Sequence, residues 1–383
     1  MLTTLRIAID ARDLLVPQRT GVERVVHHFI ESLNRVGHAA HDYRLLFDRP
    51  PPEHITRGLP GETLVVPVRY PRAQKVADVW IAWQIPRVAR EQGLDAVITP
   101  NTKFPFGSVA RFTMVHGLEW WHCPRSYRAT EWMKQCTWLL LATYFSSGVI
   151  TFARATHRDI RRIRSLGEDS VCIVPEGVNP ALRRLAPEER STTTLERLGV
   201  ERPFVLSVCS LEPRKNLERT IRAFSRLVED GEFPHQLVLV GRAGWKSSKL
   251  AALTEERGLT DRVRLTGYVS DEDLLQLYNQ ADLFVYPSLY EGFGLPLLEA
   301  MACGVPIVSS KAGSLAEVAG DAAILVDPHS EEEIASGMSR GLADEALRGR
   351  LVEAGLERVR RFSWDEMARG ICQFVDDRLR ADR

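Results

Sequence analysis

The sequence lacks any long apolar run. None of its 383 residues belongs to a hydrophobic stretch approaching the roughly 18 residues of a membrane span. The nearest candidate, residues 138–150, contains hydroxyl side chains and a glycine. The N-terminus shows no secretory signal pattern either, because Asp10 and Arg12 end its short apolar run. We therefore expect a cytoplasmic protein without a membrane-spanning helix.

Cysteine is scarce and widely scattered. The six cysteines form no C-x-x-C pair, the spacing typical of zinc sites and redox motifs. The cytoplasm keeps isolated thiols reduced. We therefore expect free, mostly structural cysteines at Cys123, Cys136, Cys172, Cys209, Cys303 and Cys372.

An excess of charge of one sign is also missing, because 50 basic residues balance 50 acidic ones. There is no basic low-complexity arm and no aromatic-interleaved RNA motif, so we expect no nucleic-acid partner. The charges are uneven, however: residues 1–180 contain 23 Lys/Arg and 17 Asp/Glu. This modest basic excess fits an anionic substrate or the inner face of the cytoplasmic membrane. Peripheral membrane contact and the oligomeric state stay open.

The sequence does contain a repeated alternation of strand-like apolar runs and helical patterns. Such alternation predicts a parallel sheet with helices on both faces, and the length suffices for two α/β domains. In the first half we expect strands at residues 6–10, 43–47, 64–68, 96–99, 112–115, 149–152 and 171–174, with helices near 25–33, 76–92 and 127–145.

The alternation breaks at residues 179–199, a polar and proline-containing segment that we interpret as a linker. It then restarts, with strands expected at 204–208, 236–240, 263–265, 283–287 and 305–309, and helices at 217–230, 246–258, 271–280 and 296–303. We therefore predict two domains, residues 1–178 and 179–364. Open α/β sheets bind ligands beyond the carboxyl ends of their strands, so we expect the site in a cleft between the domains.

The most informative segment runs from Tyr290 to Ser310. It places Glu291 and Glu299 on either side of a glycine-containing loop that leads into a helix with Pro296 in its first turn. Backbone amides at a helix N-terminus favour phosphate, and carboxylates accept hydrogen bonds from hydroxyl groups. The segment predicts a site for a phosphorylated, polyhydroxylated ligand, with an ordinary strand-to-helix turn as the simpler alternative.

Two adjacent cations, Arg214 and Lys215, follow the strand predicted at 204–208. They precede a helix, where positive charge opposes the helix dipole, and the chain has only seven lysines. We interpret the pair as a diphosphate site that stabilises the charge of a departing leaving group. A basic pair on the surface is the alternative.

Other strand ends carry weaker signals. Gly241 opens the segment G-R-A-G-W, which permits close approach of the backbone to a nucleotide, and Val269 lies in G-Y-V-S, which suits contact with a base. The acidic segment 271–273 matches a metal-binding pattern. Ser270 and Asp273 also predict an N-terminal helix cap, which we favour. We therefore predict no metal site.

In the first half, His116 follows the strand predicted at 112–115 and can donate a hydrogen bond to a sugar hydroxyl. The set His116, Glu119 and His122 lacks the H-E-x-x-H spacing of zinc enzymes, and packing beside aromatic residues explains His116 equally well. The basic cluster from Arg158 to Arg164 is typical of a solvated helix face, with contact to anionic lipid or a diphosphate-linked acceptor as the alternative.

Together these motifs resemble glycosyltransferase family 4, retaining enzymes with the GT-B fold of two Rossmann-like α/β domains facing each other across a cleft. The resemblance spans nearly the whole chain and is strongest over residues 205–328. Its most specific element is E-x7-E, carried by Glu291 and Glu299. It implies that Glu291 lies near the donor sugar, that Glu299 binds the ribose, and that Arg214 and Lys215 hold the diphosphate.

The resemblance extends to further binding residues. It implies that the backbone at Phe293, Gly294 and Leu295 holds the sugar hydroxyls and diphosphate. It places Gly21 in an N-terminal glycine-rich loop, residues 20–24, and makes His116 the active-site histidine of an acceptor-side domain.

The resemblance also covers the domain connections. The segment 174–179, V-P-E-G-V-N, resembles the interdomain connection, and 362–364, F-S-W, the start of a final helix (about 365–383) that rejoins the first domain. The chain departs from the family pattern at Glu23 and Ser210, and by H-G at 116–117.

The motifs and the resemblance predict a retaining transfer of a hexose from a nucleotide diphosphate sugar to an acceptor hydroxyl. We expect front-face attack, no metal and no other cofactor. The segments around Arg214 and Gly241 resemble mannosyltransferases of bacterial polysaccharide synthesis, so GDP-mannose is the first choice of donor. The acceptor is expected to be a carbohydrate, a lipid-linked compound or a small molecule. A nucleotide-sugar epimerase and a non-catalytic nucleotide-sugar-binding protein are the alternatives.

Overall fold

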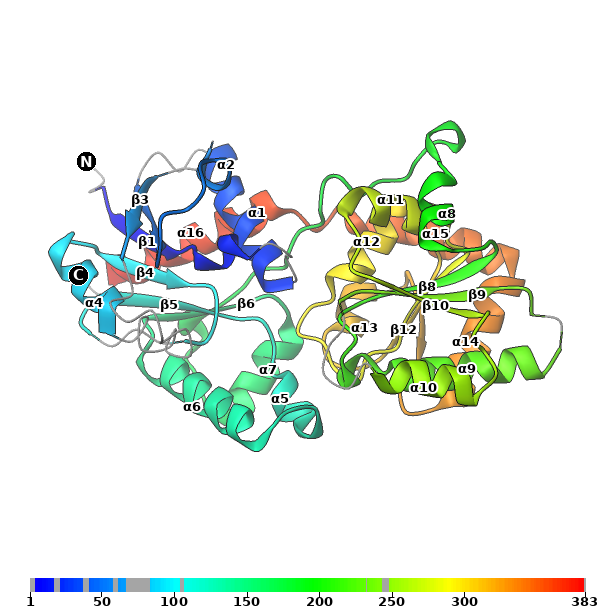
Figure 1. Cartoon of the computed structure of the whole chain (residues 1–383). Coiled ribbons are helices and arrows are strands. Elements are labelled where there is room, and N and C mark those ends of the chain that lie inside the picture. Colours follow the sequence, from blue (N-terminus) through cyan, green and yellow to red (C-terminus); the bar gives the residue numbers. More distant parts are fainter. Residues whose placement is uncertain are drawn as a thin grey trace. The chain divides into compact units, whose positions relative to one another are not determined.

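The computed structural model shows two compact units, and each is described by itself (Figure 1). The residues it describes are 4–16, 21–36, 41–57, 61–66, 83–103, 107–231, 233–242 and 248–381. Unit 1 comprises Met1–Leu118, Arg128–Glu176 and Ser363–Arg383, and unit 2 comprises Glu119–Tyr127 and Gly177–Phe362.

Unit 1 is built on a parallel sheet of seven strands in the order β3-β2-β1-β4-β5-β6-β7. Its inner strands β4 and β6 are fully buried, which explains why they read as continuous apolar runs and not as alternating ones. The strands are β1 (Arg6–Asp10), β2 (Asp42–Phe47), β3 (Glu62–Val65), β4 (Ala96–Thr99), β5 (Ala110–Val115), β6 (Gly148–Thr151) and β7 (Val171–Ile173).

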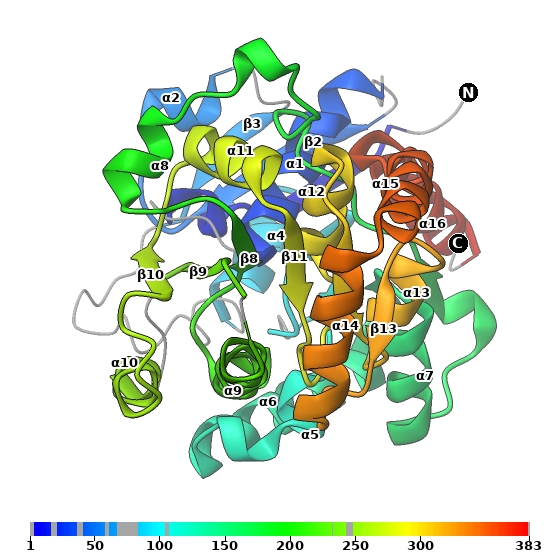
Figure 2. The ribbon, with the colours of Figure 1, turned by 90° about the vertical axis from the view of Figure 1, so that its right-hand side faces the viewer.

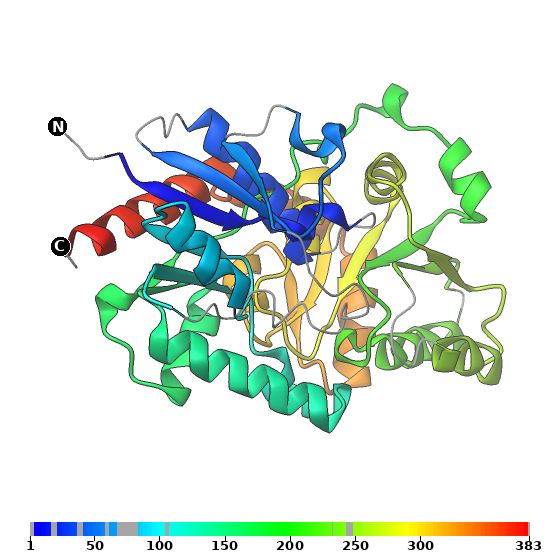
Figure 3. The ribbon, with the colours of Figure 1, turned by 60° about the vertical axis from the view of Figure 1, so that its left-hand side comes forward.

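Helices cover both faces of this sheet. The helices α1 and α16 pack against each other on one face, whereas α6 and α7 lie on the other (Figure 3). The apolar stripe of α1, from Val25 to Leu33, is buried, as its helical spacing predicts. The helices of unit 1 include α1 (Gly21–Arg35), α2 (Glu53–Thr56), α4 (Ile85–Glu91), α6 (Ala129–Phe145), α7 (Arg154–Ile163) and α16 (Trp364–Ala381).

Unit 2 contains a parallel sheet of six strands in the order β10-β9-β8-β11-β12-β13. The chain order reverses between β8 and β11, and the crevice at such a reversal is where open α/β sheets bind ligands. The strands are β8 (Phe204–Val208), β9 (Gln236–Val240), β10 (Val263–Gly267), β11 (Leu283–Tyr286), β12 (Ile307–Ser310) and β13 (Ile324–Val326).

The helices of unit 2 also form two layers. The helices α9, α10 and α14 cover one face of the sheet, and α11, α12 and α15 cover the other (Figure 2). The helices of unit 2, including those outside the two layers, are α5 (Glu119–His122), α8 (Thr193–Leu198), α9 (Leu217–Glu229), α10 (Ser248–Glu256), α11 (Asp271–Gln280), α12 (Leu295–Cys303), α13 (Leu315–Ala319), α14 (Glu331–Ala343) and α15 (Glu345–Val359). Within the described ranges, no helix combines the length and the apolar character needed to cross a membrane.

The two α/β units with all-parallel sheets confirm the predicted fold class. The six cysteines are free, as expected. The predicted domain bounds, residues 1–178 and 179–364, stay a prediction. By contacts, the chain divides between Glu176 and Gly177, and Glu119–Tyr127 groups with unit 2, a detail that the prediction does not include.

Two expectations about local structure are wrong. Residues 21–24 form the first turn of α1 and not a loop, because Glu23 in that turn interacts favourably with the helix dipole and an apolar stripe follows. The segment 179–199 is not a loose linker, since it packs on unit 2. Leu185 is buried, and its amide donates to Asn279 Oδ1 over 2.7 Å. Residues 20, 67–68, 76–82 and 243–247, which several predictions include, lie outside the described ranges.

Candidate functional site

The loop between β11 and α12 begins the candidate site. Gly294 precedes α12 with φ of 112°, a left-handed conformation that side chains rarely tolerate. A Cβ atom there would also lie 2.8 Å from Leu315 Cδ2. Pro296 occupies the first turn of α12, as predicted. Only glycine fits at position 294, so the loop has a defined shape that holds Glu291 at the carboxyl end of β11.

The Glu291 carboxylate is the centre of a buried charge cluster, with only 6% of the residue exposed. Its Oε1 accepts hydrogen bonds from Lys215 Nζ at 2.6 Å and from the Tyr286 hydroxyl at 3.0 Å. Its Oε2 accepts from Arg214 Nη1 at 2.9 Å. Burial alone would raise the pKa of Glu291, but Lys215 and Arg214 lower it to about 2. The group is therefore a carboxylate at neutral pH.

The two cations come from a short turn after β8, the 3₁₀ helix η7 (Pro213–Lys215). Asn216 follows in the left-handed conformation and ties the turn down, because its Nδ2 donates to Pro287 O at 2.9 Å and Pro328 O at 2.7 Å. Burial lowers the pKa of Arg214, but Glu291, Glu119 and Glu212 raise it well above its ordinary value. The turn thus fixes two charged cations opposite the β11 loop, at the reversal point of the sheet.

Buried serines hold the β11 loop from behind. Ser314 Oγ donates to the carbonyl oxygens of Phe293 at 2.7 Å and Glu291 at 3.0 Å, and Ser310 Oγ donates to Ser288 O at 2.6 Å. Each serine satisfies a buried carbonyl group that a helix or sheet does not. Sequence reasoning missed both serines. Ser310 is the last residue of β12 and Ser314 precedes α13, and no motif marks either position.

The second carboxylate, Glu299, lies in α12 and is 4% exposed. Its Oε2 accepts a hydrogen bond from the Tyr278 hydroxyl at 2.9 Å. The described partners of the two carboxylates of the E-x7-E motif thus differ: Glu291 binds Arg214 and Lys215, and Glu299 binds a tyrosine hydroxyl.

The remaining predicted residues of unit 2 lie at neighbouring strand ends. Gly241 directly follows β9 with φ of 146°, and a Cβ atom there would collide with the carbonyl oxygen of Cys209. Val269 follows β10 and is nearly buried, as is Leu295 at the start of α12. Phe293 is buried and packs edge-on against Phe362, with ring centroids 5.9 Å apart. The structure thus brings these residues to the carboxyl edge of one sheet.

The segment Glu119–Tyr127 joins this site from an earlier part of the chain. The His122 ring stacks on Tyr290, the residue before Glu291, with centroids 4.2 Å apart and planes 11° apart. Burial raises the pKa of Tyr127, and Glu119 raises it further, so its hydroxyl stays neutral. Sequence reasoning placed this segment in the first domain and missed the stacking, which depends on residues 168 positions apart in sequence.

Comparisons with known proteins agree with this geometry. The family "Glycosyltransferase Family 4" matches residues 19–182, and "Glycosyl transferases group 1" matches residues 195–358. One match lies in each half of the chain, and both matching families are glycosyltransferases. It is 41% identical over 162 residues to the O-antigen chain mannosyltransferase B of Escherichia coli, a match that covers 42% of this chain and 42% of that relative. The match thus spans less than half of the relative's length.

Two further proteins are similar to this chain over a larger share of its length. It is 32% identical over 262 residues to the MMP alpha-(1->4)-mannosyltransferase of Mycolicibacterium hassiacum, covering 66% of this chain and 59% of that one. The sucrose-phosphate synthase of Thermosynechococcus elongatus has a similar structure, with a TM-score of 0.76, 22% identity, and coverage of 98% and 100%. This structural likeness supports the GT-B fold.

The candidate residues of unit 1 are described separately. Gly21 is the first residue of α1. His116 follows β5, and its Nε2 lies 2.7 Å from Pro100 O, so Nε2 carries a proton because the carbonyl oxygen can only accept. Its Nδ1 lies 3.5 Å from Glu176 Oε1, and its ring packs on Phe152 at 4.8 Å. These contacts hold the His116 ring in one orientation. The catalytic role of His116 stays a prediction.

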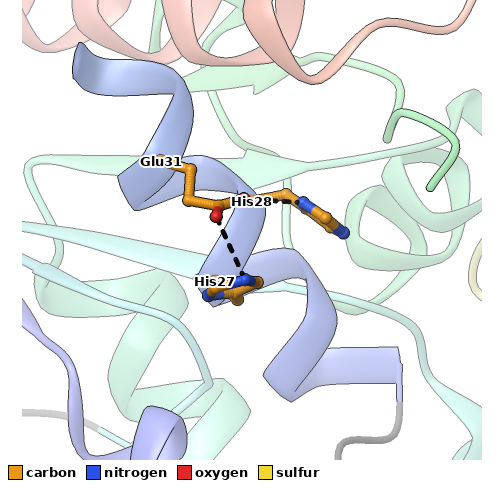
Figure 4. Close-up of side chains that lie close together, drawn as sticks. All are labelled: His27, His28 and Glu31. Atoms are coloured by element: carbon orange, nitrogen blue, oxygen red, sulfur yellow. Dashed lines mark hydrogen bonds and ion pairs between the residues drawn. The ribbon is translucent and has the colours of Figure 1, made fainter. Parts of the chain in front are cut away.

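Two groups of side chains could be considered as metal ligands. Ser270 Oγ accepts a hydrogen bond from the Asp273 amide at 3.2 Å, so the acidic segment 271–273 begins with the predicted helix cap. The described residues contain one group with metal-compatible spacing: His27, His28 and Glu31 on α1 (Figure 4). Both histidines pair with Glu31, at 3.3 and 3.1 Å.

This histidine group has a structural explanation. The His28 ring stacks on Trp364 at the start of α16, with centroids 4.8 Å apart. The hydrogen bond from His28 lowers the pKa of Glu31. The group therefore joins α1 to α16 within unit 1.

Proposed function

We propose that the protein transfers a hexose, mannose as first choice, from a nucleotide diphosphate sugar to an acceptor hydroxyl with retention of configuration. The observation that carries the proposal is the buried cluster of Arg214, Lys215 and Glu291 at the sheet reversal of unit 2. Both cations are fixed in place, Lys215 by Glu291 and Arg214 by Glu291 and Glu212. Cations fixed before the donor binds can stabilise a diphosphate leaving group, whose negative charge grows as the sugar departs.

The role of Glu291 follows from its partners. Both of its oxygens accept hydrogen bonds from cations, and Tyr286 occupies a further position. A carboxylate held in this way is a weak nucleophile, which supports front-face attack and not a covalent sugar–enzyme intermediate. The leaving phosphate would then accept the proton of the acceptor hydroxyl, while Glu291 positions the sugar and stabilises its developing positive charge.

The cations also support a reaction without a metal. In the proposed site Arg214 and Lys215 supply the charge that a divalent ion would otherwise supply to the diphosphate. If this is right, a chelator leaves turnover unchanged. A loss of activity with chelator that returns with added Mg²⁺ or Mn²⁺ contradicts this part of the proposal.

The donor and acceptor are proposed from the relatives' names. Two relatives are mannosyltransferases, and one of them is named for the O-antigen chain. We therefore propose GDP-mannose as donor and a bacterial polysaccharide or glycolipid precursor as acceptor. The buried carboxylate of Glu299 is the group proposed to bind the ribose of the nucleotide.

A donor panel tests the proposal most directly. GDP-mannose, UDP-glucose, UDP-galactose and ADP-glucose are compared by thermal shift and by release of nucleoside diphosphate with and without a mannosylated acceptor. A ligand that binds only the folded state raises the melting temperature, and GDP-mannose is expected to do so most. Conversion of the donor sugar without acceptor indicates an epimerase, and binding without release under any acceptor indicates a non-catalytic protein.

A further inference from the structure

The helix α6 of unit 1 presents an apolar face to solvent. Met133, Leu140 and Tyr144 are 57%, 42% and 56% exposed, and Phe145 beside them is 57% exposed. The first three are spaced by seven and four residues, which places them along one line of a helix. Of the eight large hydrophobic side chains exposed in the described part of the chain, four belong to this helix. This clustering is unusual for a surface helix, where the outer face is normally polar.

A basic helix lies next to this apolar face. The helix α7 carries Arg158, Arg161 and Arg162 as exposed side chains, against a single acid, Asp159, which is buried. Both helices lie on the same face of the sheet, below it in Figure 1. The chain just after α7 contacts α6, because the guanidinium of Arg164 lies 4.0 Å from the centre of the Tyr144 ring. The exposed apolar side chains of α6 and the exposed arginines of α7 therefore belong to neighbouring helices of one face, called the α6–α7 surface below.

From this surface we propose that α6 and α7 dock unit 1 onto an anionic membrane. Apolar and aromatic side chains of α6 would enter the boundary between headgroups and acyl chains, as tyrosine and phenylalanine do at membrane interfaces. The arginines of α7 would pair with lipid phosphates, and their long aliphatic stems allow this while the side chains lie along the surface.

The positive charge of this surface favours an anionic membrane over a second copy of the chain as its binding partner. A second copy of the chain would bring one set of α7 arginines against another, and like charges oppose such a contact. An anionic bilayer satisfies both halves of the surface, because it offers negative headgroups above an apolar interior. The surface lies wholly in unit 1 and contains none of the residues assigned to the donor.

Vesicle flotation of the full chain, without any sugar donor, tests the inference independently of the proposed function. Vesicles of phosphatidylcholine alone are compared with vesicles containing about one third phosphatidylglycerol. Binding is expected to the anionic vesicles, and raising the salt from about 0.05 to 0.5 M should weaken it, since salt screens the arginine contribution. Equal binding to both vesicle types, or to neither, overturns the proposal.

Variants separate the two halves of the surface. The double variant Arg158→Gln/Arg161→Gln should weaken binding about 25-fold, at about fivefold per arginine near an anionic surface. The matched control Arg226→Gln/Arg350→Gln removes two exposed arginines of unit 2 and should leave binding unchanged.

The apolar half is tested in the same way. Met133→Ser/Leu140→Ser should weaken vesicle binding about tenfold or more, because two exposed apolar side chains no longer leave water. Tyr268→Ser, an exposed aromatic of unit 2, is its control. Conversely, Leu140→Trp should strengthen binding. Unchanged vesicle binding in the serine variant, or a change in oligomeric mass by light scattering in its place, contradicts the membrane assignment.

Discussion

At the carboxyl edge of each sheet a carboxyl group lies among other charges, and the two groups ionise differently. Glu291 of unit 2 has Lys215 and Arg214 as partners, and its pKa falls to about 2. Asp13 of unit 1 follows β1, and burial, with the nearby charges of Asp10 and Glu23, raises its pKa to about 6. Burial acts in the same direction on both groups. The difference comes from the neighbouring charges: Lys215 and Arg214 outweigh burial at Glu291, whereas Asp10 and Glu23 add to burial at Asp13 and outweigh Arg12 and Lys103.

The cation nearest to Asp13 is already engaged. Arg12 donates to Asp10 through Nε and Nη2, both over 2.8 Å. Arg12 and Lys103 therefore lower the pKa of Asp13 by less than burial, Asp10 and Glu23 raise it. In unit 2 Lys215 and Arg214 both form ion pairs with Glu291, although Arg214 also pairs with Glu212. The comparison suggests that the proposed donor side keeps a permanent charge, whereas unit 1 contains a carboxyl group that titrates near neutrality.

The largest expected effect comes from removing one of the two cations. Lys215→Ala should lower kcat by about 10³-fold, since one preorganised group that stabilises leaving-group charge contributes on that scale. The measurement is single-turnover release of nucleoside diphosphate. Lys249→Ala removes an exposed lysine on α10 and serves as the control. Near-normal turnover in a folded Lys215→Ala protein would refute the assignment of the diphosphate site.

The next effect concerns the stability contributed by the Glu291 charge. The folded pKa lies below the unfolded one, so the stabilisation is present above about pH 4.5 and is lost as the pH falls toward 2. Glu291→Gln should therefore cost about 3 kcal/mol at pH 7 and much less at pH 3, from a shift of roughly two pH units. Urea unfolding of both proteins across this range measures the difference.

A matched substitution provides the control for this experiment. Glu353→Gln changes an exposed acid in the middle of α15 and should leave stability unchanged at every pH. A cost for Glu291→Gln that does not depend on pH would mean that shape, and not charge, holds the cluster together.

Asp13 should show the opposite sign. Its folded pKa lies above the unfolded one, so the ionised group destabilises the fold at pH values above about 6, and the penalty disappears on acidification below about pH 4. Asp13→Asn should stabilise the protein by about 1–2 kcal/mol at pH 8, a value reduced for partial exposure, and leave it unchanged at pH 4. Calorimetric melting at the two pH values tests this, and destabilisation at pH 8 would contradict it.

Much of unit 2 could be predicted from sequence because its strands are buried on both faces. The bounds predicted for β8 and β9 agree with the structure, as do those of α11. In unit 1 the edge strand β3 begins two residues before its predicted start, since none of its residues is buried. Burial on both faces gives a continuous apolar run, whereas an edge strand gives a weaker pattern.

The site was predictable only where a motif marks it. Glu291, Arg214 and Lys215 stand at strand ends that the pattern reveals, and the structure brings them into contact. The partners Tyr286 and Ser314 could not be predicted from the sequence. Tyr286 lies in an ordinary apolar strand and Ser314 in a loop, and neither belongs to a motif. The charge state of Asp13 depends on burial and on Asp10 at once, neither of which the sequence displays.

The smallest expected effect separates the two carboxylates of the E-x7-E motif. Tyr278→Phe removes the hydroxyl that donates to Glu299 over 2.9 Å and leaves the cluster around Glu291 intact. If Glu299 binds the ribose, this tyrosine orients it, so KM for the donor should rise about threefold to tenfold, the range of one ordinary hydrogen bond, while kcat changes little. Tyr144→Phe, which alters an exposed tyrosine of α6, is the control. A loss confined to kcat would place Glu299 with the reacting sugar, and the contrast between a charged sugar side and a neutral ribose side would then have to be abandoned.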